Sequence, residues 1–164
     1  MKKLLICGCG GHGKVVAEVA ADCGYDEIAF LDDHSSEAIG KIKDLERFAG
    51  DFQQAFVGIG NNKIRGELME QLEKAGFTLP VLIHPTAYVS RTARIGRGTI
   101  VEPKAIVNAH TRVEAGCILS VGAIVDHDVS VDMCCHVNAG AIVKAGAKID
   151  AYTKLEAGQV VLGY

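Results

Sequence analysis

The stretch VDHDVSVDMCCH, residues 125–136, gathers two histidines, three aspartates and two cysteines within twelve residues. Histidine and cysteine side chains bind zinc, but a structural zinc site takes four nitrogen or sulfur ligands, usually as two closely spaced pairs. Cys134 and Cys135 form one pair, and no second pair accompanies them. We therefore expect no metal site, and acid–base chemistry is what the histidines of this stretch allow instead.

His127 has the setting that acid–base chemistry requires, because Asp126 precedes it and Asp128 follows it. A carboxylate bonded to one ring nitrogen fixes the tautomer and raises the basicity of the other nitrogen. His127 is therefore the candidate base. His84 and His110 have no such neighbours, and we interpret them as ordinary surface histidines.

A second chemical motif is the glycine-rich stretch CGCGGHGK, residues 7–14, in which Gly8, Gly10 and Gly13 spell G-x-G-x-x-G. It follows an apolar run and opens an amphipathic one, as phosphate-binding loops do. Glycines let the backbone approach a phosphate, and the start of a helix offers N–H groups to an anion. The pattern predicts a nucleotide site that also includes the acidic pair at 32–33 and the Gly-Asn-Asn turn at 60–62, where two further strands end.

The kind of nucleotide follows from what the loop lacks and from the length of its unit. Val15 stands where the phosphate loop of nucleoside triphosphatases needs a serine or threonine for magnesium. A dinucleotide fold needs two βαβαβ halves, and only about 80 residues precede the repeats described next. We favour a mononucleotide ligand, with a nicotinamide oxidoreductase and a purely structural glycine turn as alternatives.

The elements that must position these groups fall into two parts. Residues 1–80 alternate strands at 2–7, 27–33 and 54–60 with helices at 14–24 and 62–76, which predicts a small Rossmann-like α/β domain with parallel strands. Residues 81–164 follow another rule. Every sixth residue from Ile83 to Val161 is aliphatic, fourteen in succession, and the residue four places after each is nearly always small or β-branched.

This hexapeptide period predicts a parallel β-helix in which the aliphatic and the small residues both point inward. Cys117 and Cys135 then fall on buried small positions, whereas Cys134 is expected to face outward. The fold class is therefore α/β followed by β, with the domain boundary at residues 80/81.

Composition limits the function classes. Of 164 residues, 49% are hydrophobic and 23% charged, which is a globular composition. A net charge of −3 argues against general affinity for nucleic acid or anionic membranes. No apolar run approaches the roughly 20 residues of a membrane helix, and the glycine cluster after residue 7 does not fit a signal peptide. We expect a cytoplasmic protein whose cysteines are thiols.

The combination resembles the bacterial nucleotide-sugar acetyltransferases, a family that includes the UDP-4-amino-sugar N-acetyltransferases of bacillosamine synthesis and the sialic acid O-acetyltransferases. The stretches that carry the resemblance are GGHG, FLDD, GIGNNKIR, LIHP and VDHDVSVDMCCHVNAGA. It implies a left-handed β-helix, a homotrimer, and acetyl-CoA lying along the coils between neighbouring subunits. The family's chains continue beyond this one, so the C-terminal end looks truncated.

By position, the resemblance implies that His127 is the general base and that Asp128 raises its basicity. Bacillosamine enzymes have Glu at the second position; because Asp is one methylene shorter, Asp126 is the alternative partner. His136 would contact acetyl-CoA, and Ala145 and Ala157 stand at two further backbone contacts with it. The nucleotide-sugar would be held by a set of loop residues: Gly10, Gly11, His12, Asp32, Asp33 and Gly60.

The resulting hypothesis is transfer of an acetyl group from acetyl-CoA to the amine of a UDP-linked deoxy-amino sugar. The alternatives are O-acetylation of a sugar hydroxyl, as in the sialic acid type, and a non-catalytic trimeric scaffold. Several isoleucines are expected at outward or corner places of the coils, where they would form the trimer contact: Ile106, Ile118, Ile124 and Ile142.

Overall fold

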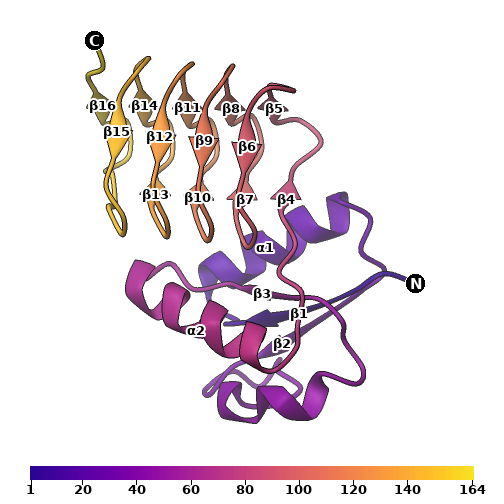
Figure 1. Cartoon of the computed structure of the whole chain (residues 1–164). Coiled ribbons are helices and arrows are strands. Elements are labelled where there is room, and N and C mark those ends of the chain that lie inside the picture. The colour runs from indigo at the N-terminus through magenta and orange to yellow at the C-terminus, as the bar shows by residue number, and fades with distance from the viewer. The chain divides into compact units, whose positions relative to one another are not determined.

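The computed structural model describes residues 1–164, which form two compact units, Met1–Pro80 and Val81–Tyr164 (Figure 1). The first unit contains a parallel three-stranded sheet in the order β2-β1-β3. Its elements are β1 (Lys3–Cys7), α1 (Gly11–Asp22), β2 (Glu27–Leu31), the 3-10 helix η1 (Ile42–Phe48), β3 (Ala55–Val57) and α2 (Asn62–Lys74). None of the helices has the length and apolar character needed to cross a bilayer.

The three strands and two α-helices of this unit lie where the sequence predicts them, although β2 and β3 are shorter than predicted and η1 was not predicted. Helix α1 begins at Gly11, three residues before the predicted start at Lys14, because the backbone turns into the helix within the glycine loop itself. Both α-helices end before a glycine with positive φ, Gly24 at 81° and Gly76 at 92°, as expected for helix C-termini. Since the strands are parallel, the segments that follow them share one edge of the sheet, where ligands bind in such folds.

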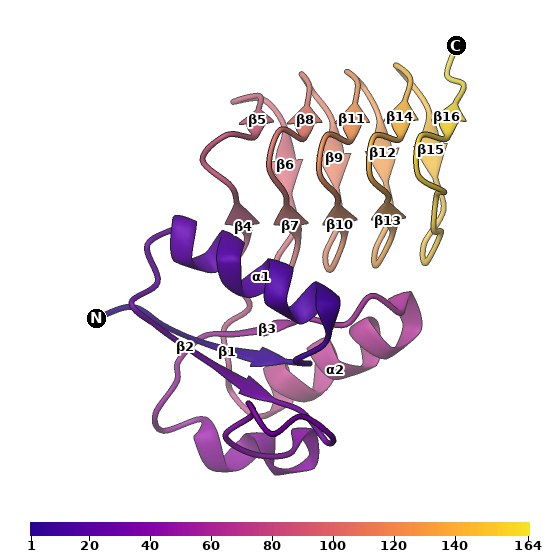
Figure 2. The same cartoon turned by 180° about the vertical axis from the view of Figure 1, so that it is seen from behind.

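The second unit is a left-handed parallel β-helix, as predicted. Two-residue strands stack into three faces, visible as three rows of short arrows in Figures 1 and 2. The first face contains β4 (Leu82–Ile83), β7 (Ile100–Val101), β10 (Ile118–Leu119) and β13 (His136–Val137). The second contains β5 (Tyr88–Val89), β8 (Ile106–Val107), β11 (Ile124–Val125), β14 (Ile142–Val143) and β16 (Val160–Val161). The third contains β6 (Arg94–Ile95), β9 (Arg112–Val113), β12 (Ser130–Val131) and β15 (Lys148–Ile149).

One coil takes 18 residues, since Ile100 pairs with Ile118 in register (118 − 100 = 18). The predicted aliphatic and small positions form one continuous core from Val101 to Leu155, and those in the first and last coils are only partly buried. At the two ends of the repeat the prediction fails: Ile83 is 38% exposed, and Gln159 is exposed as well. Cys117 and Cys135 are buried in it, as predicted.

Two expectations about single residues are wrong. Cys134 does not face outward: its exposed fraction is 0%. Ile118 is 1% exposed and contributes nothing to an outer contact surface, whereas Ile106 is 37% exposed. Periodicity identified the inward positions, but it did not tell which of the other positions are covered.

The corners of the coil impose a rule that the sequence did not reveal. From residue 98 to residue 158, every sixth residue has a positive φ, between 53° and 75°, and this is the third residue after an aliphatic core position. Glycine fills about half of these corners, because other residues adopt the left-handed region only at a cost. The eleven corner residues are Gly98, Lys104, His110, Gly116, Gly122, Asp128, Cys134, Gly140, Gly146, Tyr152 and Gly158.

We predict that Gly122→Val lowers the free energy of unfolding of the β-helix by about 1–2 kcal/mol, the cost of forcing a side-chain-bearing residue into the left-handed region. An added Cβ at Gly122 would meet no atom within 4 Å, so backbone strain is the only penalty. Gly122→Asn is the matched control and should cost clearly less, because asparagine tolerates this conformation. Urea unfolding followed by circular dichroism measures both; equal losses would contradict the corner rule.

Candidate functional site

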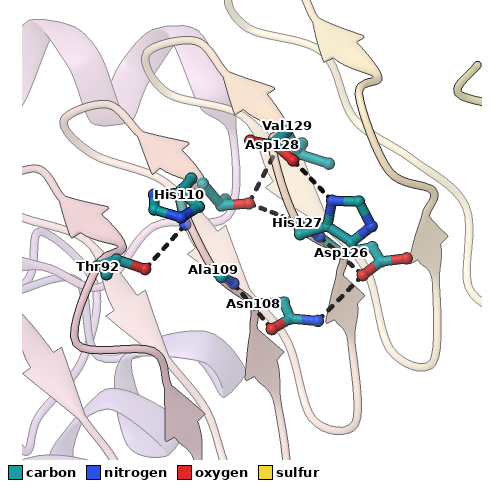
Figure 3. A network of polar contacts seen from close by, with 9 residues as sticks. Thr92, Asn108, Ala109, His110, Asp126, His127, Asp128 and Val129 are labelled. Atoms are coloured by element: carbon teal, nitrogen blue, oxygen red, sulfur yellow. Dashed lines mark hydrogen bonds and ion pairs between the residues drawn. The ribbon is translucent and has the colours of Figure 1, made fainter.

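His127 lies on the corner between β11 and β12, where its ring meets a carboxylate (Figure 3). Its Nδ1 is 2.7 Å from Oδ2 of Asp128, and both side chains are about half exposed, 46% and 51%. The predicted pairing with Asp128 is confirmed. The alternative partner, Asp126, contacts the backbone of His127 and not its ring: Asp126 Oδ1 accepts the backbone N–H of His127 at 2.7 Å.

The corner geometry explains why a short carboxylate suffices here. Asp128 occupies the left-handed corner position with φ 57°, and aspartate is one of the few residues that tolerate it. Its backbone N–H donates to the carbonyl of Ala109 one coil earlier, at 3.0 Å. The coil therefore fixes the backbone from which the carboxylate reaches the ring.

This contact sets the chemistry of the imidazole. The hydrogen bond to the Asp128 carboxylate raises the pKa of His127 above its ordinary value, and the charge of Asp126 adds to the effect. A carboxylate at Nδ1 favours the tautomer with the proton on that nitrogen, which leaves the Nε2 lone pair to accept a proton. An exposed base with raised proton affinity is what deprotonation of a bound amine or hydroxyl needs.

Two residues that the sequence analysis missed hold the backbone on either side of His127. Asn108, 18 residues before Asp126, donates its Nδ2 to Asp126 Oδ1 at 3.1 Å. Thr111 donates its hydroxyl to the carbonyl of Asp126 and accepts the N–H of Val129 at 3.2 Å. Their spacing from the His127 corner, one coil or slightly less, is a signal that could have found them once the 18-residue coil was recognised.

The residues expected to contact acetyl-CoA lie at different places on the β-helix. His136 is on β13 of the first face, with Nε2 2.9 Å from Ser120 Oγ. Ala157 belongs to the corner that follows that face. Ala145 is instead one coil beyond His127, in the same stack of corners, since Gly146 N–H donates to the His127 carbonyl at 3.1 Å. The coil thus separates His127 from His136 and brings Ala145 next to His127.

In the first unit, the glycines of the G-x-G-x-x-G motif differ in their surroundings: Gly8 and Gly13 are closely packed, and Gly10 is not. Gly8 has φ 105°, and a Cβ on Gly13 would lie 2.1 Å from the Gly8 carbonyl oxygen. A Cβ on Gly58, after β3, would lie 2.7 Å from Gly13 Cα. These glycines let the loop pack against the end of β3, whereas Gly10 and Gly11 face open space.

The N-terminus of α1 has the features of an anion-binding helix end. Its N-cap residue, Gly10, provides no side-chain cap, and no acidic residue lies in the first turn. The N-terminus of α2 differs, because Asn61 Oδ1 caps it by accepting the N–H groups of Lys63 and Ile64, both at 3.1 Å. Backbone N–H groups and the helix dipole at α1 therefore favour a phosphate there.

The predicted acidic pair, Asp32 and Asp33, forms hydrogen bonds with the backbone of the loops at the same edge of the sheet. Asp32 accepts the N–H of Cys9 in the glycine loop at 2.8 Å and the N–H groups of His34 and Ser35 at 2.9 Å each. These bonds, the one from Cys9 first, lower the pKa of Asp32. Asp33 accepts the N–H of Ile42 at 3.1 Å. Asp32 thus joins the ends of β1 and β2 in addition to any contact with a ligand.

Arg65 is the residue of this unit that the sequence analysis missed. It is 1% exposed and donates to the carbonyls of Ile59 and Gly60, each at 3.2 Å, and to Asn62 Oδ1 at 2.7 Å. Burial, with the Arg65 charge, lowers the pKa of His12 to about 4, so His12 is neutral near pH 7. Helical periodicity could have shown that Arg65 is buried, because it lies on the same face of α2 as the buried residues Leu68, Met69 and Leu72.

No group of three or more histidine, cysteine, aspartate or glutamate side chains is arranged to hold a metal ion. No disulfide joins the cysteines. That the protein works without a metal stays a prediction.

Known proteins resemble both units. A family model described as the PglD N-terminal domain matches residues 3–72. UDP-N-acetylbacillosamine N-acetyltransferase of Bacillus subtilis (strain 168) is 35% identical over 112 residues, which are 62% of this chain; the match spans only about half of that relative's length, 51%.

Among solved structures, the acetyltransferase domain of PglB from Neisseria gonorrhoeae FA1090, in complex with acetyl coenzyme A, superposes with a TM-score of 0.94 at 40% identity. The alignment covers 97% of this chain and 81% of that one. A mutant of perosamine N-acetyltransferase from Caulobacter crescentus, in complex with CoA and GDP-perosamine, gives 0.92 at 28% identity over 99% of this chain and 90% of that one. With this identity over nearly the whole length, the chain belongs to the bacterial nucleotide-sugar acetyltransferases.

Proposed function

We propose that the protein transfers an acetyl group from acetyl-CoA to the amine of a UDP-linked deoxy-amino sugar. The observation that carries the proposal is the His127–Asp128 pair at 2.7 Å on a β-helix whose relative from N. gonorrhoeae binds acetyl-CoA. The uncapped N-terminus of α1 adds a place for the nucleotide's phosphates. A cytoplasmic location is part of the proposal.

The chemistry requires one proton transfer that His127 can perform. The sugar amine attacks the thioester carbonyl, His127 Nε2 takes the proton that the nitrogen loses, and CoA leaves as a thiolate that the protonated histidine can neutralise. Asp128 stabilises the imidazolium that forms in between. A positioned base of this kind contributes about 10²–10⁴ in rate.

For the nucleotide-sugar, we propose that the diphosphate approaches Gly10 and Gly11, with neutral His12 as a hydrogen-bonding partner. Asp32, Asp33 and Gly60 would lie near the base and ribose, at the edge where β1, β2 and β3 end. UDP is proposed because the curated relative is named for a UDP-sugar, although a GDP-sugar is bound in the C. crescentus structure. For acetyl-CoA, we propose contacts with His136, Ala145 and Ala157.

An amine acceptor is favoured over a sugar hydroxyl, because two of the similar proteins are named N-acetyltransferases. O-acetylation uses the same base and stays the alternative. A scaffold without activity gains no support, because glycine would fill the left-handed corner position at lower cost than Asp128, whose carboxylate instead meets the imidazole of His127.

We also propose that the chain works as a homotrimer. The outward residue of each strand on the second face is apolar, and the row is substantially exposed at its ends, with Tyr88 at 58% and Val160 at 48%. Contiguous exposed apolar surface of this kind favours a subunit contact. The apolar row on the second face consists of Tyr88, Ile106, Ile124, Ile142 and Val160.

We predict that the protein releases free thiol from acetyl-CoA when a UDP-amino sugar is supplied, and that His127→Ala lowers kcat by at least about 10²-fold with little change in KM. The reason is loss of the base without loss of a binding group. A thiol-detection assay over a panel of UDP-amino sugars measures both. His110→Ala, on the corner one coil earlier, is the control and should keep wild-type turnover; full activity in His127→Ala would refute the assignment.

A second prediction separates the binding glycine from the packing glycine. Gly10→Ala should weaken binding of UDP at least tenfold without changing stability, because its Cβ enters open space where we place the phosphates. Gly13→Ala should destabilise the first unit, since its Cβ would lie 2.1 Å from a backbone oxygen. Isothermal titration with UDP and thermal unfolding measure the two effects. Unchanged UDP affinity in Gly10→Ala would place the phosphates elsewhere.

The trimer hypothesis predicts how much activity a mixture of two inactive variants should recover. If each active site takes its nucleotide loop from one subunit and His127 from the next, mixing equal amounts of His127→Ala and Gly10→Leu should restore activity after the subunits exchange. Each site then has a one-half chance of an intact loop and a one-half chance of an intact base, so about a quarter of wild-type activity should return. A mixture that stays inactive despite confirmed exchange would show that both elements come from one subunit.

A further inference from the structure

The interior of the β-helix contains one polar side chain in the row of small positions that includes Thr111. That row, one residue per coil, is Ala93, Thr111, Val129 and Ala147. Thr111 is 1% exposed. A buried hydroxyl is costly unless both its donor and its acceptor capacity are used, and the hydrogen bonds of Thr111 use both.

The two partners of Thr111 bracket the candidate base and its carboxylate. The hydroxyl donates to the carbonyl of Asp126, immediately before His127. It accepts the N–H of Val129, immediately after Asp128, at 3.2 Å. One side chain thus clamps both ends of the two-residue segment that carries the His127–Asp128 contact.

The neighbouring row shows that this clamp is a recurring device of the fold. Thr99, which is 0% exposed, donates to the carbonyl of Glu114 and accepts the N–H of Cys117, each at 3.1 Å. Cys117 and Cys135 continue that row with thiols that donate to the carbonyls of Asp132 and Asp150, at 3.2 and 3.0 Å. Thr99 therefore bonds both ends of its corner as Thr111 does, and each thiol bonds the carbonyl at the start of its corner. On the row of the His127 corner, Thr111 is the one residue with a polar side chain; Ala93, Val129 and Ala147 have none.

We propose that Thr111 is a positioning residue for acetyl transfer: by clamping the corner from Asp126 to Val129, it holds the His127 imidazole against Asp128 in the reactive orientation. The proposal rests on the proposed function for its catalytic part and on the two hydrogen bonds for its structural part. Thr111 touches no substrate and acts through His127.

The test compares two chemically identical changes. Thr111→Val and Thr99→Val each remove one buried hydroxyl of the same bonding pattern and keep the shape. Both should lose similar stability in urea, but only Thr111→Val should lower kcat, by about 10- to 100-fold at unchanged KM, as expected for a misplaced base. Thr111→Ser, which keeps the hydroxyl, should restore kcat. If valine at 111 prevents folding, Thr111→Ala and Thr99→Ala replace the pair, since the row already contains Ala93 and Ala147.

A second readout does not depend on turnover. In an NMR titration of the imidazole carbon-bound protons, the pKa of His127 should fall toward its ordinary value in Thr111→Val and stay raised in Thr99→Val. The titratable groups on the same corner, Asp126 and Asp128, and those at the matching positions one coil away, His110 and Lys144, are unchanged in both variants.

The outcomes distinguish the two hypotheses. A wild-type protein without acetyl transfer on any UDP-amino sugar would overturn the proposed function, and the His127 titration would still test the clamp. An active wild type in which Thr111→Val matches Thr99→Val in kcat and in the His127 pKa would overturn the positioning role.

Discussion

Each corner of the β-helix from residue 98 to residue 158 has one residue in the left-handed region of backbone space, and at the corner that carries His127 this residue is Asp128. Glycine would fill the position at lower conformational cost. Aspartate fills it and also provides the carboxylate that meets the imidazole at 2.7 Å. The constraint that closes the coil therefore also places the partner of the base, and the Asn108 and Thr111 hydrogen bonds reinforce the same corner from one coil earlier.

The first unit depends on a comparable constraint, close approach of backbone to backbone. Gly8, Gly13 and Gly58 leave no room for a Cβ, so the glycine loop lies directly against the end of β3. Asp32 ties the same loop to the end of β2, and Arg65 holds the turn that follows β3. The result is a sheet edge whose loop is held by several contacts, beside a helix N-terminus without a side-chain cap, where we propose that a phosphate binds.

Both units thus present candidate polar groups on a backbone that hydrogen bonds and close packing hold in place. Function depends on a few such groups, and their precision comes from buried supports that take no part in the chemistry. Thr111 and Arg65 are of this kind: each is almost fully buried, and each uses its polar atoms on the backbone of a segment with a candidate functional residue. Changes in such supports are expected to affect rate or affinity more than stability alone would suggest.

The sequence by itself determined the two-part architecture and most inward positions of the coils, and it singled out the loop glycines and His127 as candidates, because side-chain periodicity records burial and residue type indicates chemistry. Only the tertiary structure decided which carboxylate reaches the imidazole, since that depends on the backbone conformation at the corner and not on proximity in sequence. It also decided that Cys134 and Ile118 are buried, and that Arg65, Asn108 and Thr111 support the candidate site. These contacts join residues from different strands and coils, and a linear pattern does not show them until the 18-residue register and the corner conformation are known.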